Sequence, residues 1–222
     1  MTKKENRLEF VEIPPWKTVY IACSGGPDSM AIVDWYLRHT KKYVCVLFFN
    51  HGTHASNMGF KLLDKYLRCH KDWSDAPAIT RIFLEKETIY STDKPRDKSW
   101  EEYWRDERLK WLNSFNTHVL TGHNLDDAVE TWVWSSLHGQ SKLIPYRNGN
   151  ILRPLLLTKK STLKEWCDSH NVPYFIDPGN EDRRYMRSIV RHDILPHALK
   201  VNPGLYKVVK KKLLAEIKNT QR

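Results

Sequence analysis

Short apolar runs alternate with longer stretches of helical pattern along most of the chain. The run at residues 43–50 is apolar at nearly every position, as expected of a parallel strand that is covered on both faces. This alternation predicts an α/β fold in which right-handed crossovers join the strands of a parallel sheet. We expect strands at residues 18–23, 43–50, 78–84 and 117–121, a short apolar pair at 151–152 and an extended segment at 172–176.

The helical stretches follow the strands and continue to the end of the chain. Residues 85–98 are polar, with a proline and several charges, and predict a loop. We therefore expect an α/β domain at residues 1–157 and a mostly helical extension with a basic tail at residues 158–222. The predicted helices cover residues 30–40, 57–70, 99–113, 125–137, 161–170, 185–195 and 204–218.

The chain is basic, with a formal net charge of +10 over 222 residues and a pI of about 9.4. Such an excess attracts polyanions, but it is also compatible with an ordinary basic, soluble enzyme. No apolar run approaches the roughly 20 residues of a membrane span, and the first residues do not resemble a signal peptide. The four cysteines form no C-x-x-C pair, which predicts reduced thiols in a cytoplasmic protein rather than a zinc or redox site.

The most informative segment follows the first predicted strand and reads Ser24-Gly25-Gly26-Pro27-Asp28-Ser29. Two glycines let the backbone approach a ligand closely, and the helix behind them offers free N–H groups and a positive dipole to a phosphate. Ser24 and Ser29 add hydroxyl donors, and the Asp28 carboxylate suits a phosphate if Mg²⁺ is shared between them. The alternative is an ordinary strand-to-helix turn, because the spacing is neither that of a Walker A loop nor G-x-G-x-x-G.

Three polar segments follow predicted strands, and the carboxyl ends of parallel strands meet at the edge where such sheets bind ligands. They are the glycine-rich loop (residues 24–29), His51 after the second strand and residues 123–127 after the fourth. A lone histidine is most often structural. His51, however, lies where the ligand edge must be, so we expect it in the site.

An acidic motif (residues 123–130) contains His123, Asp126, Asp127 and Glu130. Asp126 and Glu130 are four residues apart and share one face of the predicted helix. Acidic residues at a helix N-terminus complement the helix dipole, which accounts for at least one of them. Three carboxylates beside a phosphate loop exceed what capping requires, so we expect them to hold Mg²⁺ or to bind a cationic amine.

Arginines on two further predicted helices are candidates for phosphate contacts. Arg105 lies three to four residues from two glutamates, so an intrahelical ion pair is the plain interpretation, whereas Arg108 is freer. Either guanidinium could reach a phosphate. Arg184, Arg187 and Arg191 fall on one helical stripe, which is either a solvated face or a surface for RNA phosphates.

Together these segments resemble the PP-loop ATP pyrophosphatase superfamily and, within it, the tRNA(Ile)-lysidine synthetase family. The glycine-rich loop matches the Ser-Gly-Gly-x-Asp-Ser signature of the superfamily. The narrower resemblance spans about residues 18–204. It rests on Asn50-His51-Gly52, a Glu/Arg helix at 99–108, Gly-His-x-x-Asp-Asp-x-x-Glu-Thr at 122–131, Leu152-Arg153-Pro154-Leu155 and Asp-Pro-x-Asn at 177–180.

The resemblance implies an adenine nucleotide alpha hydrolase-like (Rossmann-like) fold, with residues 1–157 as the ATP-binding catalytic domain. It also implies an ATP-dependent ligase that forms a C–N bond. ATP would adenylate the C2 carbonyl oxygen of a cytidine in the anticodon loop of an isoleucine tRNA, and the ε-amine of L-lysine would displace AMP. Which carboxylate recognises or deprotonates the amine stays open.

Residue roles follow from the same resemblance. The implied catalytic residues are Asp28, Arg105, His123, Asp126, Asp127 and Glu130. The implied ATP site consists of Ser24, Gly25, Gly26, Pro27, Asp28, Ser29 and His51, with Mg²⁺ on Asp28 and Asp127. The implied contacts to the substrate are Arg108, Arg153, Arg184, Arg187 and Arg191.

The chain departs from the family pattern at three points. Gly52-Thr53-His54 stands where the family has Gly-Leu-Arg, and Arg187-Ser188 stands where it has Arg-Asn. The chain also ends about 20 residues after the shared part, so we expect a minimal form without the C-terminal tRNA-binding domains.

Three other functions remain as alternatives to the ligase. The first is tRNA 2-thiolation, which the isolated cysteines disfavour, and the second is amide ligation on a small molecule, which the basic charge disfavours. A nucleic-acid-binding protein with a degenerate loop is the third, and the intact motifs disfavour it.

Overall fold

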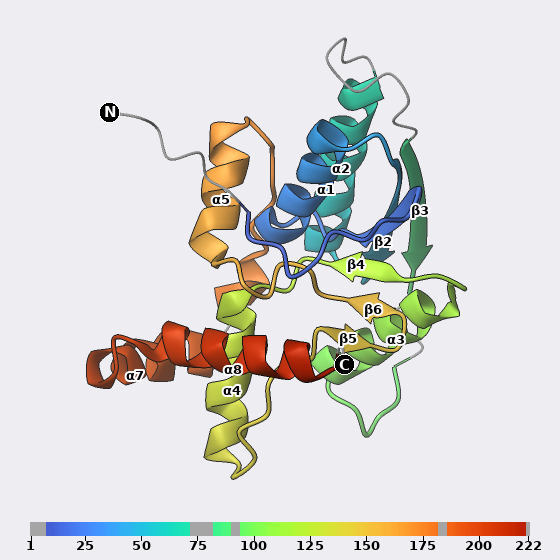
Figure 1. Cartoon of the computed structure of the whole chain (residues 1–222). Helices are drawn as coiled ribbons and strands as arrows, with labels where there is room; N and C mark the ends of the chain where they lie inside the picture. Colours follow the sequence, from blue (N-terminus) through green and yellow to red (C-terminus); the bar gives the residue numbers. More distant parts are fainter. Residues whose placement is uncertain (1–7, 72–81, 90–93, 182–185, 221–222) are drawn as a thin grey trace.

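The computed structural model describes residues 8–71, 82–89, 94–181 and 186–220. It contains one sheet of six strands in the order β3-β2-β1-β4-β6-β5 (Figure 1). All neighbouring strands run parallel except β5, which is antiparallel to β6. The predicted α/β fold with a mostly parallel sheet is therefore confirmed. The strands are β1 (Thr18–Ala22), β2 (Tyr43–Asn50), β3 (Ile82–Thr88), β4 (Val119–Thr121), β5 (Arg147–Asn148) and β6 (Ile151–Leu152).

Helix α1 begins at Pro27, within the glycine-rich loop, and thus earlier than expected. Proline suits the first helical turn because the N–H that it lacks has no partner there. None of the helices in the described ranges has the length and hydrophobicity needed to cross a bilayer. The α-helices are α1 (Pro27–His39), α2 (His54–Lys71), α3 (Trp100–Ser114), α4 (Leu125–Leu137), α5 (Lys160–Ser169), α6 (Met186–Ile189), α7 (Leu195–Val201) and α8 (Leu205–Thr220).

Apolar residues cover both faces of the sheet. On one face, Val19 and Ile21 of β1 share a buried cluster with α1, α2 and α5. On the other face, Cys45 and Leu47 of β2 pack with Leu112 of α3. β2 is buried from Val44 to Asn50, which is why its sequence reads as an unbroken apolar run.

A second cluster lies where α4 and α8 cross (Figure 1). Val129 and Val133 of α4 belong to it together with Val209 and Leu213 of α8. The predicted helical C-terminal region is therefore present, and it packs on the helix that carries the acidic motif.

The predicted domain boundary after residue 157 lies just before α5, and α5 shares a hydrophobic core with α1. Trp166 and Cys167 of α5 are buried in the same cluster as α1. The indole Nε1 of Trp166 donates to Asp34 Oδ2 of α1 at 2.8 Å. Helix α5 is thus an integral part of the α/β core, and the division of the chain into two domains stays a prediction.

Two segments differ from the sequence-based expectation. β3 covers residues 82–88, so the prediction of a loop from residue 85 was wrong, while residues 78–81 of the predicted strand lie outside the described residues. β3 is an edge strand, and its exposed Glu85, Lys86 and Glu87 give it the polar character of a loop. β6 coincides with the predicted apolar pair at 151–152, whereas β5 and its pairing with β6 were not predicted, because two exposed residues are too few to form a pattern.

The helix predicted at residues 185–195 is longer than expected. From Met186 to Val201 the chain is helical without a break, and the π-helical turn Val190–Ile194 joins α6 to α7. Such turns are rare and are frequently found at functional sites. This one carries Arg191 toward α4.

Candidate active site

The candidate site lies between β1 and β4, where the strand order changes direction. Ligands of such sheets bind at this point, beyond the carboxyl ends of the strands. The glycine-rich loop follows β1 and the acidic motif follows β4. A Cβ atom on Gly122 would lie 2.9 Å from the carbonyl carbon of Asp28, so the two segments touch at a position where only glycine fits.

Hydroxyl groups hold the glycine-rich loop together from within. Ser29 Oγ donates to Gly26 O at 3.0 Å and accepts from the N–H of Ser24 at 3.2 Å. Gly26 is the N-cap residue of α1, and no side chain caps this helix. The first N–H groups of α1 therefore remain available to an anion, as a phosphate site requires.

The loop is also clamped from outside by close backbone contacts. Gly25 has φ of +81°, and a Cβ on it would lie 2.9 Å from Gly59 O in α2. The N–H of Phe175 donates to Gly25 O at 2.8 Å, which ties residues 172–176 to the loop; they were predicted to be extended, and the structure assigns no strand to them. Gly59 is a supporting residue that sequence reasoning missed, because nothing local marks a helical glycine as a contact for a distant loop.

Asp28 lies in the first turn of α1, close enough to Asp126 and Asp127 of the acidic motif to feel their charge. Burial raises the pKa of Asp28 to about 7, and the carboxylates of Asp127 and Asp126 add to this effect, whereas Lys160 opposes it. Its Oδ1 is buried and has no hydrogen-bond partner in the described part of the chain. The site therefore holds a carboxylate that is incompletely satisfied without a ligand.

The acidic motif begins with a capping box on α4. Asn124 Oδ1 accepts from the N–H groups of Asp126 and Asp127, and Asp127 Oδ2 accepts from the N–H of Asn124 at 3.0 Å. Burial raises the pKa of Asp127 to about 6, although the Asn124 N–H opposes the shift. Asp126 is used on both oxygens, by the N–H of Lys160 at 2.8 Å and by the hydroxyl of Tyr206 at 2.8 Å.

Glu130 is held by Arg191 from the π-helical turn. The guanidinium donates from Nε to Oε1 at 2.6 Å and from Nη2 to Oε2 at 2.8 Å. Both side chains are largely buried, with 10% of Glu130 and 28% of Arg191 exposed. Asp28 and Asp127 are consequently the carboxylates of this group that are least committed to other residues.

His123 lies in the positively charged half of the site. Burial lowers its pKa to about 3, and Arg153, Arg108 and Arg187 nearby lower it further, so the ring is neutral at physiological pH. Its Nδ1 lies 2.8 Å from Thr121 Oγ1. Of these arginines, Arg153 is buried and donates from Nη1 to Pro145 O at 2.8 Å.

His51 follows β2 and lies beside Trp104 of α3, with ring centroids 5.3 Å apart. Burial lowers its pKa to about 4, and Arg108 contributes to the shift. The Nδ1 atom is buried without a hydrogen-bond partner in the described ranges. The structure thus places a neutral histidine at the edge of the sheet where the sequence predicted one.

The remaining predicted arginines are more dispersed. Arg105 is exposed and pairs with its neighbour Asp106 at 3.2 Å rather than with a glutamate of the same helix. Arg187 lies 3.8 Å from Glu101 of α3, with 63% of its side chain exposed. Arg191 turns inward to Glu130, so it does not share a solvent-facing stripe with Arg187, and Arg184 lies outside the described residues.

Lys160 is a site residue that the sequence did not indicate. It is the first residue of α5, its N–H binds Asp126, and its ammonium lies 3.8 Å from Asp28 Oδ2. It therefore connects the glycine-rich loop to the acidic motif from a third segment. No spacing rule links residues so far apart in the chain.

The residues present are compatible with Mg²⁺. Among the described residues, no group of three or more His, Cys, Asp or Glu side chains could hold a metal. Mg²⁺ in nucleotide sites commonly takes one or two carboxylates from the protein and completes its shell with phosphates and water. Asp28, with its unsatisfied buried Oδ1, and Asp127 fit that requirement.

A loop with free N–H groups at a topological switch point is suited to a phosphate, and the fold and site together define a nucleotide-binding α/β protein. The family model described as a PP-loop domain matches residues 2–198 of the chain. The protein therefore belongs to the PP-loop family.

The chain is similar to curated tRNA(Ile)-lysidine synthases. It is 27% identical over 195 residues to that of Thermosipho africanus (strain TCF52B), covering 83% of this chain and 44% of the relative. It is 31% identical over 192 residues to that of Staphylococcus aureus (strain MRSA252), covering 80% of this chain and 43% of the relative. The chain thus spans less than half the length of these relatives.

The fold also resembles a solved structure, that of the U34-tRNA thiolase NcsA from Methanococcus maripaludis. The TM-score is 0.69 at 15% identity, with 98% of this chain and 75% of the other covered. At this identity the likeness concerns the fold alone.

Proposed function

We propose that this protein is an ATP-dependent ligase of the tRNA(Ile)-lysidine synthase type. ATP transfers its AMP group to the C2 carbonyl oxygen of a cytidine in the anticodon loop of an isoleucine tRNA, and pyrophosphate leaves. The ε-amine of L-lysine then attacks C2, AMP leaves with the oxygen, and the amine loses its proton. The contact between Asp28 of the glycine-rich loop and Gly122, the residue just before the acidic motif, carries this proposal.

The glycine-rich loop is proposed to bind the phosphates of ATP through the N–H groups at the start of α1 and through the Ser24 and Ser29 hydroxyls. Asp28 would hold Mg²⁺, which supplies positive charge to those phosphates, and Asp127 would be left for the amine. Lys160 lies next to Asp28 and can add a further charge-assisted hydrogen bond to a phosphate oxygen. His51 lines the same edge as a neutral ring.

The amine of lysine would be bound or deprotonated at Asp127, because Asp126 and Glu130 already have partners. A carboxylate with a pKa of about 6 is a suitable proton acceptor near neutral pH. Of the arginines near His123, the exposed Arg187 would face the RNA phosphates. Only a neutral amine attacks carbon, so this acid–base step belongs to the proposed mechanism.

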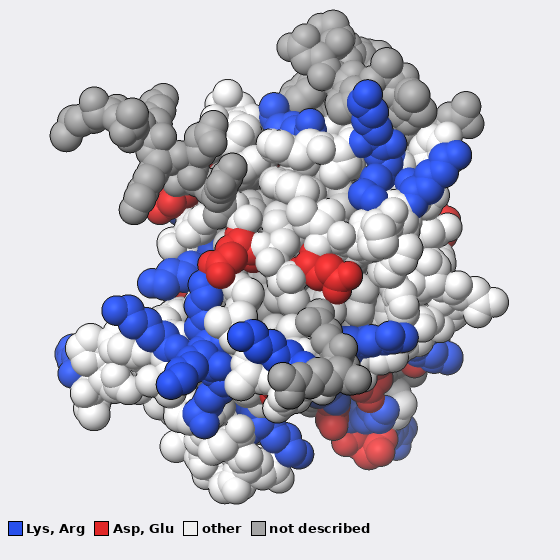
Figure 2. All heavy atoms as spheres, viewed as in Figure 1, with Lys and Arg blue, Asp and Glu red and all other residues white. Residues whose placement is uncertain are grey.

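Long-range attraction of tRNA is proposed to come from the C-terminal helices. Figure 2 shows Lys and Arg side chains gathered over α7 and α8, and α8 carries Lys207, Lys210, Lys211, Lys212 and Lys218. Such a surface binds a polyanion without selecting its sequence. We place the reaction in the cytoplasm, where tRNA, ATP and reduced thiols occur together.

The test incubates the protein with bulk tRNA, ATP, Mg²⁺ and either labelled lysine or a labelled sulfur donor. We expect lysine label in the tRNA and tRNA-dependent release of pyrophosphate. Sulfur label in the tRNA without lysine label would refute the ligase in favour of 2-thiolation. Pyrophosphate release that does not depend on tRNA would favour an amide ligase acting on a small molecule. Asp28→Asn should abolish product and pyrophosphate release, whereas Asp64→Asn, at a half-buried residue of α2 that pairs with Arg68, should abolish neither.

A further inference from the structure

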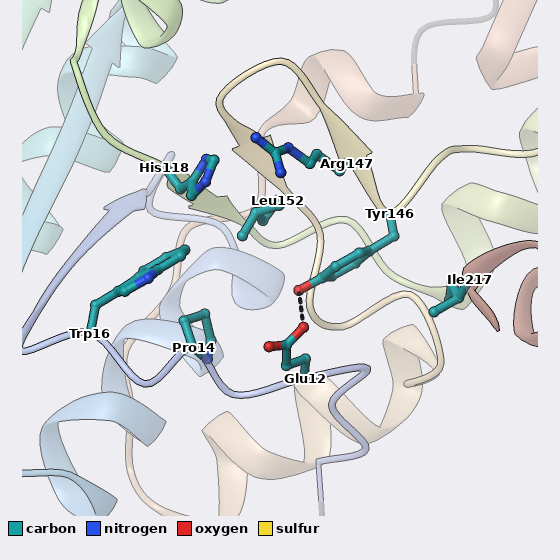
Figure 3. Close-up of a pocket in the computed structure, with 8 residues that line it drawn as sticks. All are labelled: Glu12, Pro14, Trp16, His118, Tyr146, Arg147, Leu152 and Ile217. Carbon is teal, nitrogen blue, oxygen red and sulfur yellow. Dashed lines mark hydrogen bonds between the residues drawn. The ribbon is translucent and has the colours of Figure 1, made fainter. Parts of the chain in front are cut away.

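A pocket of about 290 Å³ lies away from the glycine-rich loop, at the amino ends of β1 and β4 (Figure 3). Trp16 and His118 stand just before these two strands, Tyr146 stands just before β5, and Arg147 is the first residue of β5. Ligand pockets usually measure about 300–1,000 Å³, so this volume suits one small ring system rather than an extended molecule. None of the residues that line it takes part in the site described above.

Aromatic rings form two walls of the pocket. The rings of Trp16 and His118 lie 5.1 Å apart and are tilted by 32°. Tyr146 enters from the other side in Figure 3, and Pro14, Leu152 and Ile217 complete an apolar lining. Trp16 and Tyr146 are only half-buried, so part of their ring surface is open to a guest. Flat rings stack on such surfaces with a gain that a flexible alkyl chain does not obtain.

The polar groups of the pocket favour a guest without net charge. Glu12 and Arg147 are both exposed and lie on opposite sides of the pocket (Figure 3). The carboxylate disfavours an anion, and the guanidinium disfavours a cation. The Tyr146 hydroxyl contacts Glu12 Oε2 at 3.5 Å, and burial raises the pKa of Tyr146 to about 12, so the phenol stays protonated. It can therefore both donate and accept a hydrogen bond.

We propose that this pocket binds a nucleobase. The base stacks between the Trp16–His118 pair and Tyr146, and its polar edge bonds to the Tyr146 hydroxyl and the Glu12 carboxylate. Arg147, whose Nε donates to Gly149 O at 3.3 Å, is placed at the rim for an adjoining phosphate. Free nucleotides and unpaired bases of RNA share this chemistry, and neither source requires the proposed ligase reaction.

The test reads the pocket directly by NMR of the Leu152 and Ile217 methyl groups. The probes are the four ribonucleosides, a single-stranded RNA hexamer and an abasic hexamer with the same phosphates. We expect both methyl groups to shift with base-containing probes and not with the abasic one. Hexamer binding that is much tighter than nucleoside binding would identify RNA as the source, and equal binding would identify free nucleotides.

Trp16→Leu should weaken binding roughly 5- to 150-fold, the range for loss of one stacking partner, while Trp16→Phe should retain most of it. Trp134→Leu is the matched control, since Trp134 is an exposed tryptophan on α4, and it should change nothing. If Trp16→Leu does not fold, Arg147→Ala, at an exposed residue, should weaken the hexamer and spare the nucleosides. The proposal would be overturned if no base-containing probe shifts the methyl resonances, or if the abasic hexamer shifts them equally.

Discussion

The pair between Glu130 and Arg191 offers a sharp test of the packing around α4. Arg191→Met removes two hydrogen bonds of 2.6 and 2.8 Å and leaves a glutamate that is only 10% exposed without a donor. Breaking one side of a buried pair costs about 3–5 kcal/mol, and we expect the lower value, because 28% of Arg191 is exposed and water can reach the pair. For a chain of this size, about 3 kcal/mol corresponds to a fall of roughly 6–12 °C in Tm.

Urea unfolding followed by circular dichroism measures the change. Arg187→Met is the matched control, since its pair with Glu101 spans 3.8 Å and is exposed, and it should cost less than about 0.5 kcal/mol. The double variant Arg191→Met/Glu130→Leu should recover most of the loss, because both charges are then removed. A single variant that loses less than about 1 kcal/mol, or a double variant no more stable than the single one, would refute the reasoning.

Three further predictions concern the glycine-rich loop and its supports. The pKa of Asp28 is about 7 in the folded protein and lies above its unfolded value, so ionisation of Asp28 destabilises the fold as pH rises from about 4 to 7. Asp28→Asn should therefore raise the free energy of unfolding by roughly 1–3 kcal/mol at pH 8 and by little at pH 4. Urea unfolding at both pH values measures the difference. Gly122→Ala places a Cβ 2.9 Å from the backbone of Asp28, and steady-state kinetics should show a higher KM for ATP with a stability loss of about 1–3 kcal/mol. Trp166→Phe removes a donor from the buried carboxylate of Asp34 and should lower unfolding free energy by about 1–3 kcal/mol in denaturant.

Local signals in the sequence were sufficient for β1, β2 and β4 and for the two segments that meet in the site. The apolar run of β2 predicted a covered strand because both of its faces are in fact packed. The glycine-rich loop after β1 and the start of α4 were recognisable because turns and helix caps depend on residues that are neighbours in the sequence. The parallel sheet order then brought both loops to one edge.

Other features depended on residues far apart in the chain and could not be predicted. Lys160 lies beside Asp28, which is more than a hundred residues earlier in the chain, and Arg191 of the π-helical turn binds Glu130, which is 61 residues away in sequence. The edge strand β3 was misassigned because its exposed face is charged. These errors arise where tertiary packing decides a residue's partner and the local pattern does not.

We assign different roles to neighbouring carboxylates of the acidic motif, one in stabilising the fold and one in binding the substrate amine. Asp126 ties the start of α5 and the hydroxyl of Tyr206 to α4, whereas Asp127 uses one oxygen for the capping box and keeps the other free in the described part of the chain. Asp126→Ala should therefore lower unfolding free energy by about 1–3 kcal/mol, and lowering the assay temperature should restore activity. Asp127→Asn keeps an oxygen for the Asn124 N–H, so it should leave stability nearly unchanged and abolish lysine transfer. The opposite result, an inactive but stable Asp126→Ala and an active Asp127→Asn, would show that the amine depends on Asp126, the carboxylate that we assign to the fold.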